Sequence, residues 1–282
     1  MAHETPETRP HRRPRPTRRG RLVLFTGAVL VLAVAAAVLV PLLTRGPGTE
    51  QPRSLVIPEG WRATQVYAAV DKALDQPAGT TAKAAATADL PLPAEAKGNP
   101  EGYLFPATYP VTSATTPKSL LRYMVDTAVE RFGAEHITAG ARRNDVTVYQ
   151  TVTIAAIVQA EADTEADMGK VARVIHNRLD RGMPLQMDST LNYAMNRSTL
   201  DTTTGDTKID SPYNSYEHKG LPPTPIGNPG EQAMTAAISP TPGPWLYFVT
   251  VAPGDTRFTD DYAEQQRNVA EFNRNRRGAG EG

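Results

Sequence analysis

One uninterrupted apolar segment, from Leu22 to Leu43, limits the possible architectures of this chain more than any other feature. It has 22 residues and no charged side chain, and as an α-helix it would extend about 33 Å. The hydrocarbon core of a bilayer is about 30 Å thick. A cleaved signal peptide has a shorter apolar core of about 7 to 15 residues, and a buried core helix seldom runs this far without a charge. We therefore interpret the segment as an uncleaved transmembrane helix.

The charges beside this segment predict its orientation. Residues 1–21 contain seven arginines, no lysine and two glutamates, whereas the chain as a whole is neutral. Such a basic block is typical of either a nucleic-acid-binding arm or a membrane-flanking tail. The apolar segment that follows favours the second, so no nucleic acid is expected as a partner. The positive-inside rule then places the tail in the cytoplasm and the residues after the span outside the membrane.

Metal and thiol chemistry find little support in the composition. The chain has no cysteine, which excludes disulfides, thiolate nucleophiles and cysteine metal sites. Its five histidines are scattered without the spacing of metal ligands. We therefore expect neither a metal ion nor another cofactor.

Composition and periodicity divide the chain into parts of different character. Because helical periodicity alternates with short strand-like runs, the fold class is expected to be α+β. The expected parts are a disordered basic cytoplasmic tail (1–21), a transmembrane helix (22–43), a linker (44–53), a small β-turn-α unit (54–98), a larger mixed domain (99–276) and a second disordered tail (277–282).

Capping residues locate several helices in the larger domain. Thr116 is an expected N-cap before Pro117, and Gly133 an expected stop. Gly182 is expected to end another helix in a left-handed conformation. The apolar spacing predicts further helices over about 146–162, 166–181 and 231–238, followed by a strand at 245–251 and a polar helix at the end.

Glu161 is the first candidate for chemistry. Within the run "IAAIVQAEAD" (154–163), Ile154, Ile157, Val158 and Glu161 fall at helical spacing, so the carboxylate continues an apolar stripe. Burial would raise its pKa and let it keep a proton near neutral pH. The alternative is that Glu161 lies in the last helical turn, where the helix meets solvent, and local spacing does not decide between the two.

Two further segments carry polar side chains in irregular backbone. The first, "SPYNSYEHKGLPPTPIGNPG" (211–230), is too rich in Pro and Gly to be regular. Its Tyr213, Asn214 and Tyr216 would suit a sugar-binding wall, although a rigid surface loop is an equal alternative. The second, "LQMDST" (185–190), contains Asp188, either a second carboxylate or the cap of a following helix. The sequence contains no phosphate-binding loop and no Gly-x-Ser-x-Gly motif.

Five blocks in order resemble the MltG or YceG-like family of membrane-anchored endolytic murein transglycosylases. They are "PEGYLFPATYPV", "AAIVQAEA", "VARVIHNRLDRGMPLQMDSTLNYAM", "SPYNSYEHKGLPPTPIGNPG" and "WLYFVTV". The resemblance implies a lytic transglycosylase domain that cleaves the β-1,4 bond between N-acetylmuramic acid and N-acetylglucosamine and leaves 1,6-anhydro-muramyl ends. It also implies peptidoglycan glycan strands as substrate and cell-wall synthases as candidate partners.

The same resemblance assigns roles to individual residues. The family's catalytic glutamate maps onto Glu161, and Gln159 stands where many relatives have an acid, which supports Glu161 as the essential one. The unit at 54–98 resembles a shortened LysM-like module, and Gln265 takes the place of a histidine found in relatives. A catalytically silent glycan-binding or scaffold protein of the same fold is the alternative. The residues expected to orient the glycan are Gln186, Asp188, Tyr213, Asn214 and Tyr216.

Overall fold

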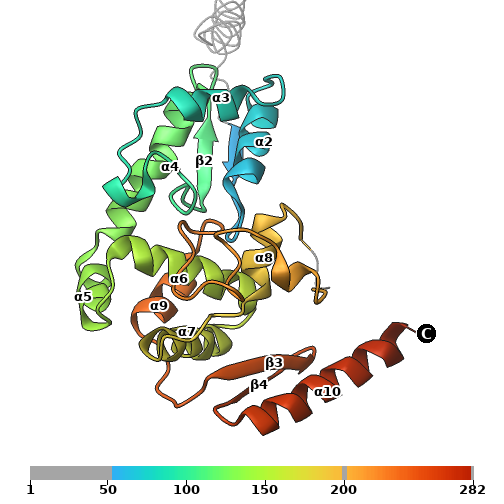
Figure 1. The fold of residues 1–282 in the computed structure, drawn as a ribbon. Helices are drawn as coiled ribbons and strands as arrows, with labels where there is room; N and C mark the ends of the chain where they lie inside the picture. The colour runs from blue at the N-terminus through green and yellow to red at the C-terminus, as the bar shows by residue number, and fades with distance from the viewer. Residues whose placement is uncertain (1–52, 199–201, 281–282) are drawn as a thin grey trace, which may run out of the picture. The chain divides into compact units, whose positions relative to one another are not determined.

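The structure, a computed structural model, describes residues 53–198 and 202–280, which form the α+β fold that the sequence predicts (Figure 1). The expected tail at 1–21, the expected membrane span at 22–43 and nearly all of the linker at 44–53 lie outside these residues. Among the helices that the structure does describe, none is both long enough and apolar enough to cross a bilayer.

The N-terminal part of the fold is a two-stranded antiparallel sheet with helices against it (Figure 1). Leu55 lies opposite Tyr109 in the register of the two strands, and both side chains are buried. The second strand lies beyond residue 98, so this sheet joins the expected small unit to the expected larger domain. The elements in chain order are β1 (Arg53–Val56), α2 (Ala63–Ala73), α3 (Thr80–Thr87), η1 (Ala94–Ala96) and β2 (Thr108–Val111).

A buried carboxylate fixes the connection between the first two helices. Asp71 accepts hydrogen bonds from the backbone N–H of Gly79 and of Thr81, each at 2.7 Å, and a third from the Thr81 hydroxyl at 2.6 Å. As the acceptor, the Asp71 carboxylate thereby satisfies N–H groups at the start of α3 that would otherwise lack partners.

The middle of the fold is helical, and α6 is its central helix. Helices α5, α7, α8 and α9 all contact α6, and every residue of α6 from Thr151 to Val158 is buried. A helix that is buried all round has no single apolar stripe. The sequence predicted one buried face for this helix, whereas the structure buries all of its faces between Thr151 and Val158. The helices are α4 (Pro117–Phe132), α5 (Glu135–Arg143), α6 (Val148–Glu161), α7 (Glu165–Asp180), α8 (Asp188–Ala194), η2 (Asp206–Lys208) and α9 (Glu231–Ile238).

Local capping chemistry sets several of these boundaries. The Thr116 hydroxyl accepts the Ser119 N–H at the start of α4, and Thr147 does the same with Gln150 at the start of α6. Gly182, just after α7, has the positive φ of 61° that the sequence predicts for a helix end. Helices α4, α7 and α9 therefore begin and end within about a residue of the positions expected from the sequence.

The C-terminal part is a hairpin with a long helix against it (Figure 1). Strands β3 (Tyr247–Ala252) and β4 (Asp255–Thr259) are antiparallel, and α10 (Tyr262–Gly280) packs on both. We expected disorder from residue 277, whereas the helix continues to Gly280. The Asn275 amide donates to the Val251 carbonyl at 2.9 Å and holds the later turns of α10 against β3.

Candidate active site

Glu161 is the last residue of α6, and the chain turns away at Ala162 in extended backbone. Its side chain is half-buried against the first turn of α8, where the Ser189 N–H donates to Oε1 at 3.2 Å. Burial raises the pKa of the Glu161 carboxyl above its ordinary value; hydrogen bonds from Ser189 oppose this effect and the nearby Asp188 carboxylate adds to it. The C-terminal end of a helix also disfavours a negative charge. The acid form of Glu161 is therefore favoured.

Asp188 and Tyr216 form a pair beside this carboxyl group. The Tyr216 hydroxyl donates to Asp188 Oδ1 at 2.5 Å. Burial, the hydrogen bond to Asp188 and the charge of Asp188 all raise the pKa of Tyr216 above its ordinary value, so the tyrosine stays a phenol. Of the predicted alternatives for Asp188, the capping role is not observed: Met187 is the N-cap of α8, and Asp188 is its first helical residue.

Ser215 joins the segment before α8 to the loop at 211–230. Its carbonyl accepts the Gln186 N–H, and its hydroxyl accepts the Met187 N–H, each at 2.9 Å. The same hydroxyl lies 2.8 Å from the Thr190 hydroxyl. These bonds bring the two predicted polar segments together, although they are about 25 residues apart in the chain.

Asn214 has a different position from the one expected of a sugar-binding side chain. It is fully buried, and its amide nitrogen donates to the carbonyls of Thr207 and Ile209 at 3.1 and 2.9 Å. Its amide oxygen accepts the Tyr216 N–H at 3.0 Å. All three contacts are with backbone groups, so Asn214 shapes the loop that presents Tyr216.

Arg178, on the last turn of α7, is a site residue that the sequence reasoning missed. It is buried, and its Nη1 donates to the Leu185 carbonyl at 2.7 Å and to the Gln186 amide oxygen at 3.2 Å. Its Nε donates to the Leu246 carbonyl at 2.6 Å. The guanidinium carbon also lies 5.2 Å from the centre of the Tyr247 ring. An arginine within a predicted amphipathic helix gives no local sign of this role.

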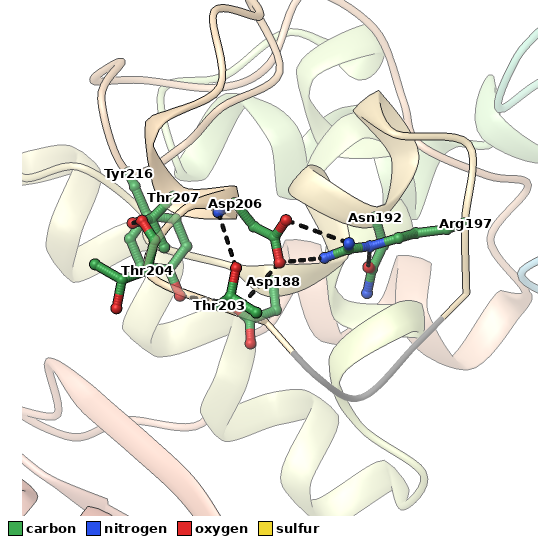
Figure 2. Close-up of polar contacts among 8 residues, drawn as sticks. All are labelled: Asp188, Asn192, Arg197, Thr203, Thr204, Asp206, Thr207 and Tyr216. Carbon is green, nitrogen blue, oxygen red and sulfur yellow. Dashed lines mark hydrogen bonds and ion pairs between the residues drawn. The ribbon is translucent and has the colours of Figure 1, made fainter.

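An ion pair joins Arg197, which follows α8, to Asp206 at the start of η2, and Figure 2 shows it together with Asp188 and Tyr216. Arg197 Nη2 lies 2.7 Å from Asp206 Oδ2, and the same oxygen accepts the Thr203 N–H at 2.8 Å. The hydrogen bond from Arg197 lowers the pKa of Asp206 to about 2, so the pair remains charged at neutral pH.

Tyr213 belongs to a second polar cluster rather than to the surroundings of Glu161. Its hydroxyl lies 2.9 Å from the Thr224 hydroxyl, and its ring centre lies 4.9 Å from that of Tyr193. The Tyr193 hydroxyl in turn donates to the buried Glu101 at 3.1 Å. Of the six predicted site residues, the structure therefore places Asp188 and Tyr216 beside Glu161, and Gln186 against Arg178 and Ser215.

No group of three or more histidine, aspartate or glutamate side chains gathers to suit a metal ion in the described part of the chain. A hollow of about 430 Å³ is lined by Glu59, Phe105, Pro106, Glu231 and Gln232. None of these lining residues belongs to the predicted site.

The fold and site together define an α+β protein that presents one carboxyl group, with its acid form favoured, between a central helix and an irregular tyrosine-bearing loop. Residues 32–271 match the model of the YceG-like family, and the chain belongs to this family. A crystal structure of a yceG-like protein from Listeria monocytogenes is similar, with a TM-score of 0.65 and 29% sequence identity over 78% of this chain and 76% of that one.

Curated relatives match over part of their length. A Bacillus subtilis protein named endolytic murein transglycosylase is 37% identical over 171 residues, which are 59% of this chain and 46% of the relative. A protein of the same name from Streptococcus pneumoniae strain D39 is 37% identical over 177 residues, 61% of this chain and 32% of the relative. The matched region thus spans about half of the first relative and about a third of the second.

Proposed function

We propose that this chain is a membrane-anchored endolytic lytic transglycosylase that cleaves peptidoglycan glycan strands. The bond cleaved is the β-1,4 bond between N-acetylmuramic acid and N-acetylglucosamine, and the product end is 1,6-anhydro-N-acetylmuramic acid. Membership of the YceG-like family and the names of the relatives support the substrate class. The observation that carries the proposal is the half-buried Glu161, whose acid form the surroundings favour.

The reaction needs one group that first gives and then takes a proton. Glu161 protonates the glycosidic oxygen as the bond from that oxygen to C1 breaks, and the N-acetylglucosamine leaves with a free hydroxyl. The C6 hydroxyl of the same muramic acid then attacks C1, and the Glu161 carboxylate takes its proton. The new bond joins O6 to C1, no water is consumed, and the enzyme returns to its acid form.

This mechanism accounts for the difference between Glu161 and Asp188. Most glycosidases use two carboxyl groups, one as acid and one as nucleophile or base. Here the substrate's own hydroxyl replaces the second group, so Asp188 is free to be tied to Tyr216. We assign Asp188 and Tyr216 to stabilising the positive charge that develops at C1, and Gln186 and Tyr213 to binding the sugars. Asn214 acts through the loop that it supports.

We also propose that the segment Leu22–Leu43 anchors the protein in the cell membrane, with the catalytic part on the outer side. The unit after residue 54 is proposed to be a LysM-like module, and a cell-wall synthase is a candidate partner. Because the chain has no cysteine, a single cysteine introduced at an exposed position such as Asp163 would test the topology. A membrane-impermeant maleimide should label it in intact cells, and protection from the reagent would refute this orientation.

Digestion of purified murein sacculi tests the reaction itself. The full chain should release muropeptides with anhydro-muramyl ends, which are one water lighter than reducing ends by mass spectrometry. Glu161→Gln should lower the rate by at least about 10²-fold, because it removes the proton donor. Asp163→Asn is the matched control, since Asp163 is exposed and two residues away.

Each other outcome has a definite meaning. Reducing ends as the main product would identify a hydrolase. Equal anhydro product from Glu161→Gln and from wild type would exclude Glu161 as the acid. Binding of sacculi with no change in glycan length would favour the silent binding protein.

A further inference from the structure

Arg178 places a positive charge in the interior next to the proposed site. The residue is 6% exposed and forms no ion pair with any of the described residues. An arginine stays charged in proteins, and a buried charge is costly unless it is paired or fully hydrogen-bonded. Its acceptors are three backbone carbonyls, those of Pro184, Leu185 and Leu246, and one side chain, that of Gln186.

The contact with Gln186 fixes which way that amide points. A glutamine side chain has an acceptor oxygen and a donor nitrogen, whereas a guanidinium offers only donors. The 3.2 Å contact with Arg178 Nη1 therefore requires the oxygen of Gln186 to face inward. The side chain is exposed, and its Nε2 bonds to no other group in the part of the chain that the structure describes. Two N–H donors are thus left facing solvent.

The backbone of Gln186 is held as firmly as its amide. Its φ of +52° is left-handed, a conformation that costs energy for a residue with a side chain. The Gln186 N–H donates to the Ser215 carbonyl at 2.9 Å, and the Arg178 bonds to the carbonyls of Pro184 and Leu185 hold the preceding residues. Ser215, which accepts this N–H, directly precedes Tyr216, whose hydroxyl is bonded to Asp188, so the Gln186 backbone is tied to the segment that carries the proposed site.

We infer that Arg178 is a positioning residue that polarises Gln186, so that this side chain donates an N–H group to the carbonyl oxygen of an acetamido group on the glycan. Both sugars of the strand carry such a carbonyl, and an amide carbonyl accepts hydrogen bonds more strongly than a hydroxyl does. The inference rests on the proposed function, because it takes peptidoglycan as the ligand.

Binding of a GlcNAc–MurNAc tetrasaccharide to the full chain tests this polarity. Calorimetry in a Glu161→Gln background gives the Kd without turnover. Gln186→Met removes both donor and acceptor, and Gln186→Glu replaces the donors with acceptors. Both should raise the Kd about fivefold or more, since each loses this hydrogen bond to the ligand. Gln266→Glu is the control for added charge, because Gln266 is exposed on α10.

Two results would overturn the inference. The first is a Kd that Gln186→Glu preserves and Gln186→Met does not, since Gln186 would then be an acceptor. The second is a Kd that neither substitution changes.

A double-mutant cycle separates positioning from a merely structural role. As a single substitution, Arg178→Lys should raise the Kd, but in the Gln186→Met background it should cause no further rise. A merely structural effect would instead lower the melting temperature and raise the Kd whether or not Gln186 is present. A lower melting temperature with an unchanged Kd would refute the positioning role of Arg178. If Arg178→Lys does not fold, the two Gln186 variants still test whether Gln186 donates to the ligand. Tetrasaccharide binding without anhydro product from wild type would refute the proposed function alone, and unchanged binding by the Gln186 variants of an active enzyme would refute the inference alone.

Discussion

Glu101 gives the sharpest prediction about stability. Its carboxyl group is 3% exposed and joins two parts of the fold, since Oε1 accepts the Ala63 N–H at the start of α2 and Oε2 accepts the Tyr193 hydroxyl of α8. Burial raises the pKa of Glu101 from 4.5 to about 7, against the opposing effects of these hydrogen bonds and of the Arg62 charge. Arg62 itself lies over the Tyr193 ring, 5.3 Å from its centre.

The sign of the effect follows from proton binding. Between pH 4.5 and 7 the native state keeps the proton on Glu101 and the unfolded state loses it, so the free energy of unfolding falls as the pH rises. The stabilisation is fully present below the unfolded pKa and is lost as the pH passes the folded pKa. The two pKa values differ by about 2.5, and each unit is worth 1.36 kcal/mol. The total loss attributable to Glu101 is therefore about 3 kcal/mol.

Glu101→Gln should remove this pH dependence, because glutamine resembles the protonated acid and can still accept the Ala63 N–H. Urea unfolding of both proteins from pH 4 to 9, followed by tryptophan fluorescence, gives the two free energies. The difference between variant and wild type should grow by about 3 kcal/mol over this range. Glu217→Gln, at an exposed position, should follow wild type. A difference that stays constant with pH, or that shrinks as the pH rises, would refute the reasoning.

Two other substitutions test the packing and the site. Gly102→Ala should cost about 2 kcal/mol or more, because Gly102 has φ +85° and a new Cβ would lie 2.5 Å from Pro225 Cγ. Gly98→Ala is the control, because Gly98 has a similar φ of +83° but a new Cβ there would meet no atom within 4 Å. If the two substitutions lowered the melting temperature equally, the steric argument would fail. Tyr216→Phe should lower kcat on sacculi about tenfold or more, because Asp188 loses a hydrogen bond to its charged group. Tyr262→Phe, at an exposed position, should leave kcat unchanged. If both substitutions lowered kcat equally, the role given to the Tyr216 hydroxyl would be wrong.

Local sequence signals predicted most of the helices. Thr116 and Gly133 bound α4 because capping and helix termination depend on a few neighbouring residues. Helix α5 was not expected, because its nine residues are too few for a clear apolar repeat. A helix after Asp188 was considered only as one of two alternatives, because the seven residues of α8 give no clear repeat either. The pairing of β1 with β2 was also not expected, because about 50 residues separate the strands and no local pattern specifies a distant partner.

The candidate site was predicted as separate segments rather than as an arrangement. Residue chemistry identified Glu161, Asp188 and Tyr216, whereas Ser215 and Arg178 emerged only from the structure. Both act mainly on backbone groups of another segment, and a sequence pattern does not show which carbonyl or N–H a side chain will meet. The same holds for Asn228, which is buried and bonds the Leu104 N–H and the Trp61 carbonyl, each at 2.7 Å.

In the last turn of α6, two nearby residues have different roles: Gln159 supports the fold, and Glu161 carries the proposed chemistry. The Gln159 amide oxygen accepts the Gly230 N–H at 3.0 Å, at the N-cap of α9, and its side chain lies against Gly60. Glu59 also lies against Gly230, so an acid at position 159 would set two carboxylates at the same helix end and each would repel the other. A neutral amide avoids this repulsion. Residue 159 therefore anchors α9, while Glu161, on the side of α6 that meets α8, is the residue whose surroundings favour a proton.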